Sequence, residues 1–321
     1  MTLTQLGYAL AVDRYRNFGQ AAKACFVTQP TLSMQLQKLE AELGVVLFDR
    51  SRKPVVPTPE GEVLLPQFRA VLRQRDRVTE LVDELQGVVA GSYRLAVIPS
   101  MATTVLPRVL GDFVASHPRV ELHVEELVTA EIVQRLVDET LDGAIVATPL
   151  LDPRLTEYPL AREELVVYHA DDASLALDSD GAVRLDATPL DHLLVMRQGH
   201  CLRNQTLDLC AMGQTAMRSQ PLVMEATSLA TLCRIVHLGP YFTVLPGLVA
   251  ADLAAAGETD RIKPIAGEVP YRQIGLVVRR TERRRAVREA LATAAARALP
   301  ALATPGRTPR PRPVPPGRSG R

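Results

Sequence analysis

The segment TQPTLSMQLQKLEAELG, residues 28–44, constrains the fold of this chain more than any other. Thr28 is a good helix N-cap, Pro30 fits a first helical turn, and Gly44 is typical of a helix end. Apolar residues recur between them at helical intervals: Leu32, Leu36, Leu39 and Leu43. This spacing predicts an amphipathic helix with one buried face. Its polar face carries Gln29, Thr31, Ser33, Gln35 and Lys38.

The stretches on either side of this helix extend the pattern. The preceding one, GYALAVDRYRNFGQAAKACFV, has helical apolar spacing, with small alanines where two helices would cross. The following one, VVLFDRSRKPVVPT, predicts a short β-ribbon with Arg50, Arg52 and Lys53 at its tip. A helix, a tight turn, a second helix with a polar face and a basic ribbon predict a winged helix-turn-helix over residues 1–58.

Such a unit places its second helix in the major groove of double-stranded DNA. The residues that could contact base edges or phosphates there are Gln29, Pro30, Thr31, Ser33 and Gln35. Those that could neutralise phosphates are Lys38, Arg50, Arg52 and Lys53. A helical pair packed only for stability would have the same apolar spacing, so the prediction depends on the order of the features.

A second long helical pattern follows Thr58, with Pro59 and Glu60 in its first turn. Its apolar residues recur at heptad-like intervals: Leu64, Phe68, Val71, Val78, Val82 and Leu85. The spacing predicts a linker helix over residues 59–89 that pairs with its twin in a second copy of the chain. Packing within one subunit is the alternative.

Buried strands dominate the pattern after residue 89. They are YRLAVIP, VELHVEE, DGAIVA, ELVVYHA, HLLVM, YFTVLP and QIGLVVR. Helical stretches lie between several of them, so we expect an α/β region with mostly parallel sheets over residues 90–300. Residues 301–321 are rich in proline and arginine, which predicts a disordered tail. The five arginines of the tail lower the formal net charge of the remainder from +1 to −4, so the rest of the chain is not globally basic.

Charged residues interrupt the first apolar run, and no stretch approaches 18 apolar residues. These features argue against a signal peptide and a membrane span, and against an exported solute-binding protein. We therefore expect a cytoplasmic protein whose four cysteines are reduced thiols.

Two motifs, AAKACFVTQPTLSMQLQKLEAELGVVLFDR and PTPEGEVLL, resemble those of the LysR-type transcriptional regulators. The resemblance covers roughly residues 1–300. It implies a winged helix that binds promoter DNA, a linker helix that dimerises, and a regulatory domain of two α/β subdomains of the periplasmic-binding-protein type. We expect subdomain I at about 90–163 and 268–300, and subdomain II at about 164–267. The family also implies a homodimer or homotetramer that works with RNA polymerase.

The segment GHCLRNQTLDLC, residues 199–210, resembles the peroxide-sensing OxyR branch of that family. Further matches are IPS at 98–100, VTAE at 128–131, EATSLATL at 225–232 and RQIGLVVR at 272–279. In that branch a second cysteine nine residues after the first completes a redox switch. The resemblance therefore implies a reversible Cys201–Cys210 disulfide, formed in response to hydrogen peroxide, that activates antioxidant genes.

The chemistry of the residues agrees with this assignment. Cys201 has His200 and Arg203 as neighbours and lies near a predicted helix start, and each of these could lower the pKa of its thiol. Cys210 lies between apolar residues, which suits the resolving thiol. In a helix the two Cα atoms would lie about 13 Å apart along the axis. A disulfide tolerates at most about 7 Å, so the bond requires the segment to unfold.

The resemblance also assigns residues that would bind or activate peroxide. They are Ser100, Thr129, His200, Arg203, Asn204 and Arg272. Ser100 stands where the family usually has threonine, and Asn204 where it usually has aspartate. The first keeps a hydroxyl, whereas the second lacks a carboxylate, which bears on rates more than on the chemistry. Simpler alternatives are helix capping for Ser100 and Thr129, and an ordinary salt bridge for Arg272.

Two other functions remain open. One is a regulator of the same family whose α/β cleft binds a small metabolite, with the cysteines incidental. The other is a thiol peroxidase, for which a DNA-reading unit would have no purpose, so no enzyme activity is expected. No cofactor or metal is expected either, because a zinc site at the cysteine pair lacks evident third and fourth ligands. Cys25 and Cys233 fit buried small hydrophobes.

Overall fold

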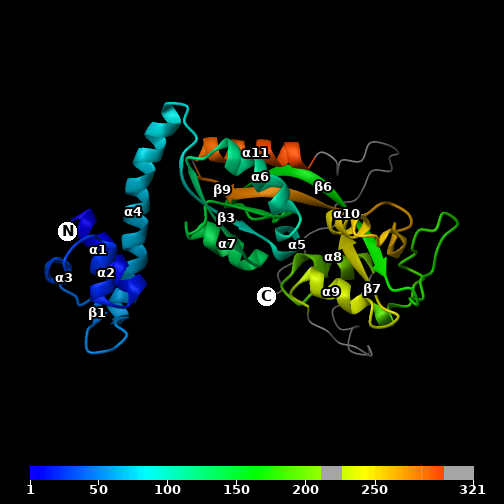
Figure 1. The fold of residues 1–321 in the computed structure, drawn as a ribbon, viewed down its shortest axis with the longest axis horizontal. Helices are drawn as coiled ribbons and strands as arrows, with labels where there is room; N and C mark the ends of the chain where they lie inside the picture. Colours follow the sequence, from blue (N-terminus) through cyan, green and yellow to red (C-terminus); the bar gives the residue numbers. More distant parts are fainter. Residues whose placement is uncertain (211–225, 283, 300–321) are drawn as a thin grey trace. The chain divides into compact units, whose positions relative to one another are not determined.

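The computed structural model describes residues 1–210, 226–282 and 284–299, and the chain divides into two compact units after Gly87. Figure 1 shows the elements of both units in colours that follow the sequence. The tail predicted at 301–321 lies outside the described residues. In the described part of the chain, every helix is too short or too polar to cross a lipid bilayer.

The first unit is a winged helix-turn-helix, as predicted. Its elements are α1 (Leu3–Tyr15), α2 (Phe18–Ala24), α3 (Gln29–Leu43), β1 (Phe48–Asp49), β2 (Val56–Pro57) and α4 (Pro59–Leu85) (Figure 1). The expected caps of α3 are present, since Thr28 Oγ1 accepts a hydrogen bond from the Thr31 amide and Gly44 ends the helix with a φ of 71°. β1 and β2 pair antiparallel and form the expected ribbon.

One apolar core holds this unit together. The side chains that α2 and α3 bury in it include Ala21, Ala22, Leu32, Leu36 and Leu39. Leu65 and Phe68 join the core from the first half of α4, which therefore packs within the unit. Leu72 is half-buried against this core, whereas other later apolar residues of α4 are exposed: Val71, Val78, Leu81, Val82 and Leu85. The second half of this helix thus presents an apolar stripe that the first unit leaves exposed.

The second unit is an α/β domain, as predicted. Its strands are β3 (Gly91–Val97), β4 (Val120–Glu126), β5 (Gly143–Thr148), β6 (Leu155–His169), β7 (Phe242–Pro246), β8 (Ile262–Lys263) and β9 (Tyr271–Arg279). Its α-helices are α5 (Pro99–Ala102), α6 (Val105–Ser116), α7 (Thr129–Val137), α8 (Cys201–Leu209), α9 (Leu229–Val236), α10 (Gly247–Ala255) and α11 (Arg285–Ala298). Two 3₁₀ turns, η1 (Leu190–His192) and η3 (Thr259–Arg261), complete the described elements.

The expectation of mostly parallel sheets is wrong for the described strands. Their order is β4-β3-β5-β9-β6-β7, with β8 also on β6, and only the β3–β4 and β3–β5 pairs are parallel. The reason is the path of the chain. It leaves the first half of the unit along the long strand β6 and returns along β9, so these two strands must run in opposite directions.

The stretch HLLVM is not a strand. It follows the 3₁₀ turn at Leu190–His192 and makes only isolated bridges, from Leu193 to Phe242 and from Met196 to Ala226. Its apolar side chains are nevertheless buried, which explains why the sequence resembles a core strand. This segment leads directly into the loop before α8.

Two apolar cores divide the second unit. The first contains residues of β3, β5, α6, α7 and α11, and the second contains residues of β7 and α9. Three elements contribute to both cores: β6, α8 and α10. Figure 1 shows them where the two halves of the unit meet. Whatever moves α8 therefore acts on both cores.

Candidate redox site and DNA-binding surface

Helix α8 begins at Cys201 and reaches to Cys210. Cys201 is its first residue, His200 is its N-cap, and Cys210 is its C-cap, with the amide of Cys210 bonded to the Thr206 carbonyl at 3.1 Å. Both cysteines are free thiols. An α-helix of this length separates the two Cα atoms by about 13 Å. The predicted helix start is therefore present, and a disulfide requires this helix to unwind.

The two thiols lie in different surroundings. Cys201 packs in the first core of the unit, together with residues such as Met101 and Leu248. Cys210 packs in the second core, together with residues such as Leu207. Both cysteines are buried, at 9% and 7% exposure. Joining the sulfurs must remove at least one of them from its core, and that loss of packing holds the reduced state in place.

A buried ion pair lies beside Cys201. Arg272 on β9 donates from Nε to Glu163 Oε2 at 2.7 Å, and both side chains have 0% exposure. The same guanidinium donates from Nη1 to Ser100 Oγ at 2.7 Å and from Nη2 to the Ser100 carbonyl at 3.1 Å. The Ser100 side chain in turn hydrogen-bonds Cys201. The structure thus connects Glu163, Arg272, Ser100 and Cys201 in one continuous network.

This network opposes the effect of burial on Cys201. Burial raises the pKa of the Cys201 thiol above its ordinary value, while the charge of Arg272 and the hydrogen bond of Ser100 lower it. Backbone N–H groups in the first turn of α8 also favour the thiolate. For Cys210, the described residues supply no such partner, and burial raises the pKa of its thiol to about 12. Cys201 is therefore the better placed of the two to ionise.

Arg203 and Asn204 follow Cys201 in α8. Arg203 was expected to lower the pKa of the thiol, but its Nη1 donates to the carbonyl oxygen of Met196 at 3.1 Å. Arg272, which was also expected to favour the thiolate, is the cation that lowers the pKa of Cys201. Asn204 is half-buried. Of the two arginines expected to favour the thiolate, the one on the distant strand β9 is thus the one that lowers this pKa.

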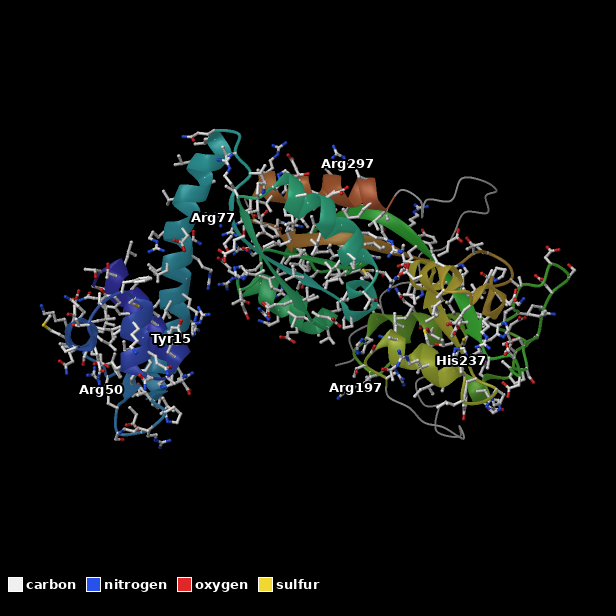
Figure 2. The ribbon with its side chains drawn as sticks, in the orientation of Figure 1. Tyr15, Arg50, Arg77, Arg197, His237 and Arg297 are labelled. Carbon is white, nitrogen blue, oxygen red and sulfur yellow. The ribbon has the colours of Figure 1, made fainter. Side chains whose placement is uncertain are left out.

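His200, the N-cap of α8, and Thr129, the first residue of α7, are also among the residues assigned to the peroxide site. Burial lowers the pKa of His200, the positive charge of Arg197 (labelled in Figure 2) lowers it further, and Glu126 raises it. The neutral imidazole is therefore favoured near neutral pH. Glu126 ends β4, and Thr129 begins α7 three residues later, half-buried. The effect of Glu126 on His200 indicates that this end of β4 faces the start of α8.

Two residues of the site were missed by sequence reasoning. Glu163 accepts from Arg272 and also from the Leu248 amide at 3.0 Å, so it ties the start of α10 to β6. Gln205 is buried one helical turn after Cys201, and its Oε1 has no hydrogen-bond partner among the described residues. Its spacing from Cys201 could have revealed it, because residues four apart share a helix face. Nothing in the sequence around Glu163 marks it.

No group of three or more His, Cys, Asp or Glu side chains in the described part of the chain is arranged to hold a metal ion. Cys233 is buried on α9, and Cys25 is half-buried at the end of α2. Burial raises the pKa of both thiols, to about 12 for Cys233.

The residues predicted to contact DNA fall into two groups. The exposed ones are Gln29, Pro30, Lys38, Arg50, Arg52 and Lys53, although Arg52 also pairs with Asp49 at 3.2 Å. The other three, Thr31, Ser33 and Gln35, are half-buried and, like Arg50, are engaged within the unit. Gln35 Oε1 accepts from Gln5 at 3.2 Å, and Thr31 shares a 2.8 Å hydrogen bond with Thr28. Arg50 donates to Ser33 at 3.2 Å and to Glu40 at 2.7 Å.

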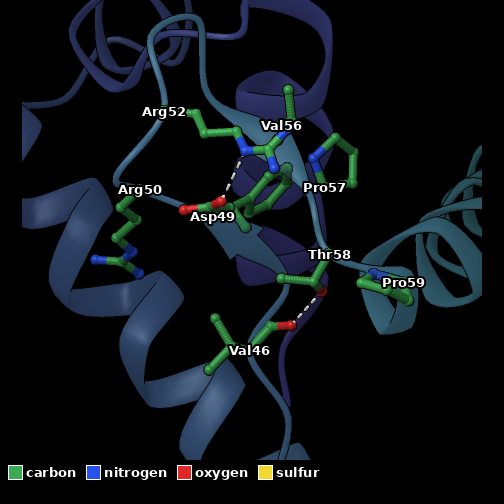
Figure 3. Close-up of a pocket in the computed structure, with 9 residues that line it drawn as sticks. Val46, Asp49, Arg50, Arg52, Val56, Pro57, Thr58 and Pro59 are labelled. Carbon is green, nitrogen blue, oxygen red and sulfur yellow. Dashed lines mark hydrogen bonds and ion pairs between the residues drawn. The ribbon is translucent and has the colours of Figure 1, made fainter.

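The interactions of Arg50 organise the ribbon. Its guanidinium lies over the Phe18 ring, 5.0 Å from the centroid, and its partner Glu40 also accepts from the Leu47 amide at 2.8 Å. Figure 3 shows the open hollow next to it, between the ribbon and the start of α4, where Arg52 pairs with Asp49. Arg50 therefore anchors the ribbon to α3 although it is exposed, and Arg52 and Lys53 are further exposed cations at the tip.

Comparisons with known proteins agree with both units. Residues 3–62 match the family "Bacterial regulatory helix-turn-helix protein, lysR family", and residues 86–299 match the "LysR substrate binding domain". A curated relative is the hydrogen peroxide-inducible genes activator of Haemophilus influenzae. It is 32% identical over 281 residues, which cover 87% of this chain and 91% of the relative.

Two solved structures extend the likeness. One is a full-length OxyR from Pseudomonas aeruginosa with a cysteine replaced by aspartate, at a TM-score of 0.69 and 28% identity, covering 92% of this chain and 98% of that one. The other is a hydrogen-peroxide-bound cysteine-to-serine variant of OxyR from Corynebacterium glutamicum, at a TM-score of 0.60 and 31% identity, covering 92% of each chain. The chain belongs to the LysR family of bacterial DNA-binding transcriptional regulators, rather than to a family of enzymes.

Proposed function

We propose that this regulator responds to hydrogen peroxide through a reversible disulfide between Cys201 and Cys210. The observation that carries the proposal is α8, which begins at one cysteine and ends at the other, with the two thiols in separate cores. The charge of Arg272 acts on Cys201 alone of the pair. The relative named for peroxide induction and the peroxide-bound neighbour support the choice of oxidant.

The proposed reaction has two steps. In the first, the Cys201 thiolate attacks one peroxide oxygen and breaks the O–O bond, which leaves a sulfenic acid and a hydroxide that is protonated to water. Ser100 and Arg272 stabilise the thiolate, and the unpartnered Oε1 of Gln205 can accept a hydrogen bond from peroxide. In the second, the Cys210 sulfur attacks the sulfenic sulfur, the S–S bond forms and a second water leaves. Two thiols and one peroxide thus become a disulfide and two waters.

The disulfide would act on the rest of the regulator through α8. Because α8 contributes to both cores, unwinding it changes how the two halves of the second unit pack. We propose that this alters the arrangement of subunits in a homodimer or homotetramer. The exposed apolar stripe on the second half of α4 supports pairing with a second copy.

The regulator would work in the bacterial cytoplasm, where thiols are kept reduced between stimuli. It would bind double-stranded promoter DNA through the exposed residues of α3 and the ribbon. We propose that the oxidised form activates antioxidant genes together with RNA polymerase.

Two measurements on the same sample test this function. The reduced, full-length protein is treated with micromolar peroxide, its cysteine peptides are mapped by mass spectrometry without reduction, and its footprint is recorded on DNA selected by the reduced protein. We expect a Cys201–Cys210 link and a changed footprint, both reversed by dithiothreitol. A footprint that responds to a small metabolite but not to peroxide would favour the metabolite-binding alternative.

A further inference from the structure

Phe26 occupies an unusual position in the turn between α2 and α3. Its side chain is 96% exposed. Its backbone has a φ of 57°, in the left-handed region that bulky side chains rarely adopt. Two hydrogen bonds hold it there, from its own amide to the Lys23 carbonyl at 3.1 Å and from the Val27 amide to the Ala22 carbonyl at 3.0 Å. The residue therefore carries a backbone cost without burying its ring.

Folding alone does not account for phenylalanine at this position. Asparagine, which tolerates the left-handed region better, would suit the turn and would expose no apolar surface. Phe26 neither belongs to the core of the unit nor packs against it. A ring that gains nothing from the fold indicates a contact made outside it.

The position of Phe26 along the chain indicates what that contact is. Phe26 lies two residues before Thr28, the N-cap of α3, and Gln29 and Pro30 in the first turn of α3 are exposed. In a helix-turn-helix, the N-terminal residues of the second helix meet the edges of the bases. Lys23, also exposed, offers a cation beside the same turn. The ring is thus presented at the side of the unit that meets DNA.

We propose that Phe26 is a further DNA-contacting residue, whose ring packs against the C5-methyl group of a thymine at the edge of the major groove. This inference rests on the proposed DNA-binding function. Phenylalanine is one of the side chains that make apolar contacts with this methyl group. The contact would add preference for thymine at one position of the site, without adding any charge.

The test combines a protein variant with a DNA change. A duplex is first selected from a random pool by the wild-type, full-length protein, and each thymine is then replaced in turn by deoxyuracil, which lacks only the methyl group. We expect one replacement per half-site to weaken wild-type binding by about 3- to 10-fold, within the range of a single base contact. The Phe26→Asn variant should bind the original duplex more weakly by a similar factor and should be indifferent to that replacement.

Two further readouts separate a DNA contact from a structural role. Phe26→Asn should melt at the same temperature as wild type or higher, because asparagine relieves the backbone cost. The slope of binding against salt should be unchanged, since no phosphate contact is lost. Leu151→Asn is the matched control, because Leu151 is also exposed, at 80%, with a φ of 59°, but lies in the second unit. It should leave DNA affinity unchanged.

Three outcomes would overturn the inference. If Phe26→Asn bound every duplex like wild type, or kept the full sensitivity to deoxyuracil, either result would exclude the methyl contact. A change in oligomeric state by light scattering that accounts for the lost affinity would assign Phe26 to self-association instead. Failure of the wild-type protein to select any DNA is distinguishable from these, because it would overturn the proposed function itself.

Discussion

Each end of α8 carries a cysteine, but the two thiols lie in opposite surroundings. At the first residue, Cys201 has Ser100 and the buried Arg272 as partners, and the first helical turn supplies N–H groups. At the other end, Cys210 is surrounded by an apolar core, and burial alone sets the direction of its pKa shift. The proposed division into an attacking and a resolving thiol thus depends on what each end of the helix packs against, rather than on its sequence neighbours.

The same comparison explains why the reduced state persists. Burial raises the pKa of both thiols, so neither end stores a fully formed thiolate. The intact helix also keeps the two Cα atoms about two disulfide spans apart. In the proposed reaction, oxidation at the first end therefore precedes the rearrangement that brings the second end to it.

Replacing each cysteine in turn should give two qualitatively different proteins. In Cys201→Ser, Cys210 should form neither a sulfenic acid nor a disulfide at micromolar peroxide, because its thiol has a pKa of about 12. Cys210→Ser should accumulate a sulfenic acid at Cys201 that dimedone traps. Mass spectrometry of the labelled peptides measures both. Dimedone labelling of Cys210 in Cys201→Ser, at a rate close to that of wild-type Cys201, would abolish the distinction between the ends.

The pH dependence of alkylation should separate the two thiols next. In Cys210→Ser, the rate of Cys201 alkylation by iodoacetamide should still rise above pH 8, by about tenfold per pH unit, because burial raises its pKa. In Cys201→Ser, the rate at Cys210 should continue rising to higher pH. Because burial raises the pKa of both thiols in the folded state, each thiol stabilises the fold at low pH. This contribution to the stability is lost as the pH rises through the folded-state pKa of the thiol. A plateau for Cys201 below pH 7 would contradict the direction of the shift.

We expect Arg272 to supply the positive charge that favours the Cys201 thiolate. The double variant Arg272→Met/Glu163→Gln removes both buried charges together, and glutamine keeps an oxygen for the Leu248 amide. We expect peroxide to oxidise Cys201 about tenfold more slowly, since an opposite charge at this range shifts a pKa by about one unit or more. Stopped-flow fluorescence or quenched alkylation measures the rate.

Arg203→Met is the matched control for that variant. Its guanidinium bonds the Met196 carbonyl and is not among the main causes that shift the pKa of Cys201, so the rate should change by less than about threefold. If Arg203→Met slowed oxidation as much as the double variant, the cation next to Cys201 in the sequence would be as active as Arg272. Circular dichroism of both variants checks that the fold is kept.

Local contacts and long-range contacts differ in how far they could be predicted from the sequence. Contacts within a short stretch were predictable, such as the caps of α3 and the helix that starts at Cys201, because they follow from local spacing. The Glu163–Arg272 pair was not, since its members are 109 residues apart in sequence and meet only through the pairing of β6 with β9. The first half of β6 was also missed, because its side chains are mostly half-buried and Pro159 interrupts the strand pattern.

The smallest effect should come from the helix dipole. Asn204→Asp places a carboxylate in the first turn of α8, where the structure has none, and Asp208→Asn removes one from the last turn. Both changes should stabilise the helix by about 0.3–1 kcal/mol, because negative charge is favoured at the N-terminus and disfavoured at the C-terminus. Since the disulfide requires α8 to unwind, both should slow its formation by about two- to fivefold.

The two changes differ in their distance from the attacking sulfur, which makes the pair informative. A carboxylate at position 204 also lies close to Cys201, so it should raise the pKa of that thiol and slow the sulfenate step, whereas the change at Asp208 should leave that step alone. Quenched-flow trapping with dimedone reports the first step, and non-reducing peptide mapping reports the second. If Asp208→Asn left the second step unchanged while Asn204→Asp slowed only the first, unwinding of α8 would not limit disulfide formation. The barrier would then lie in the chemistry at Cys201 alone.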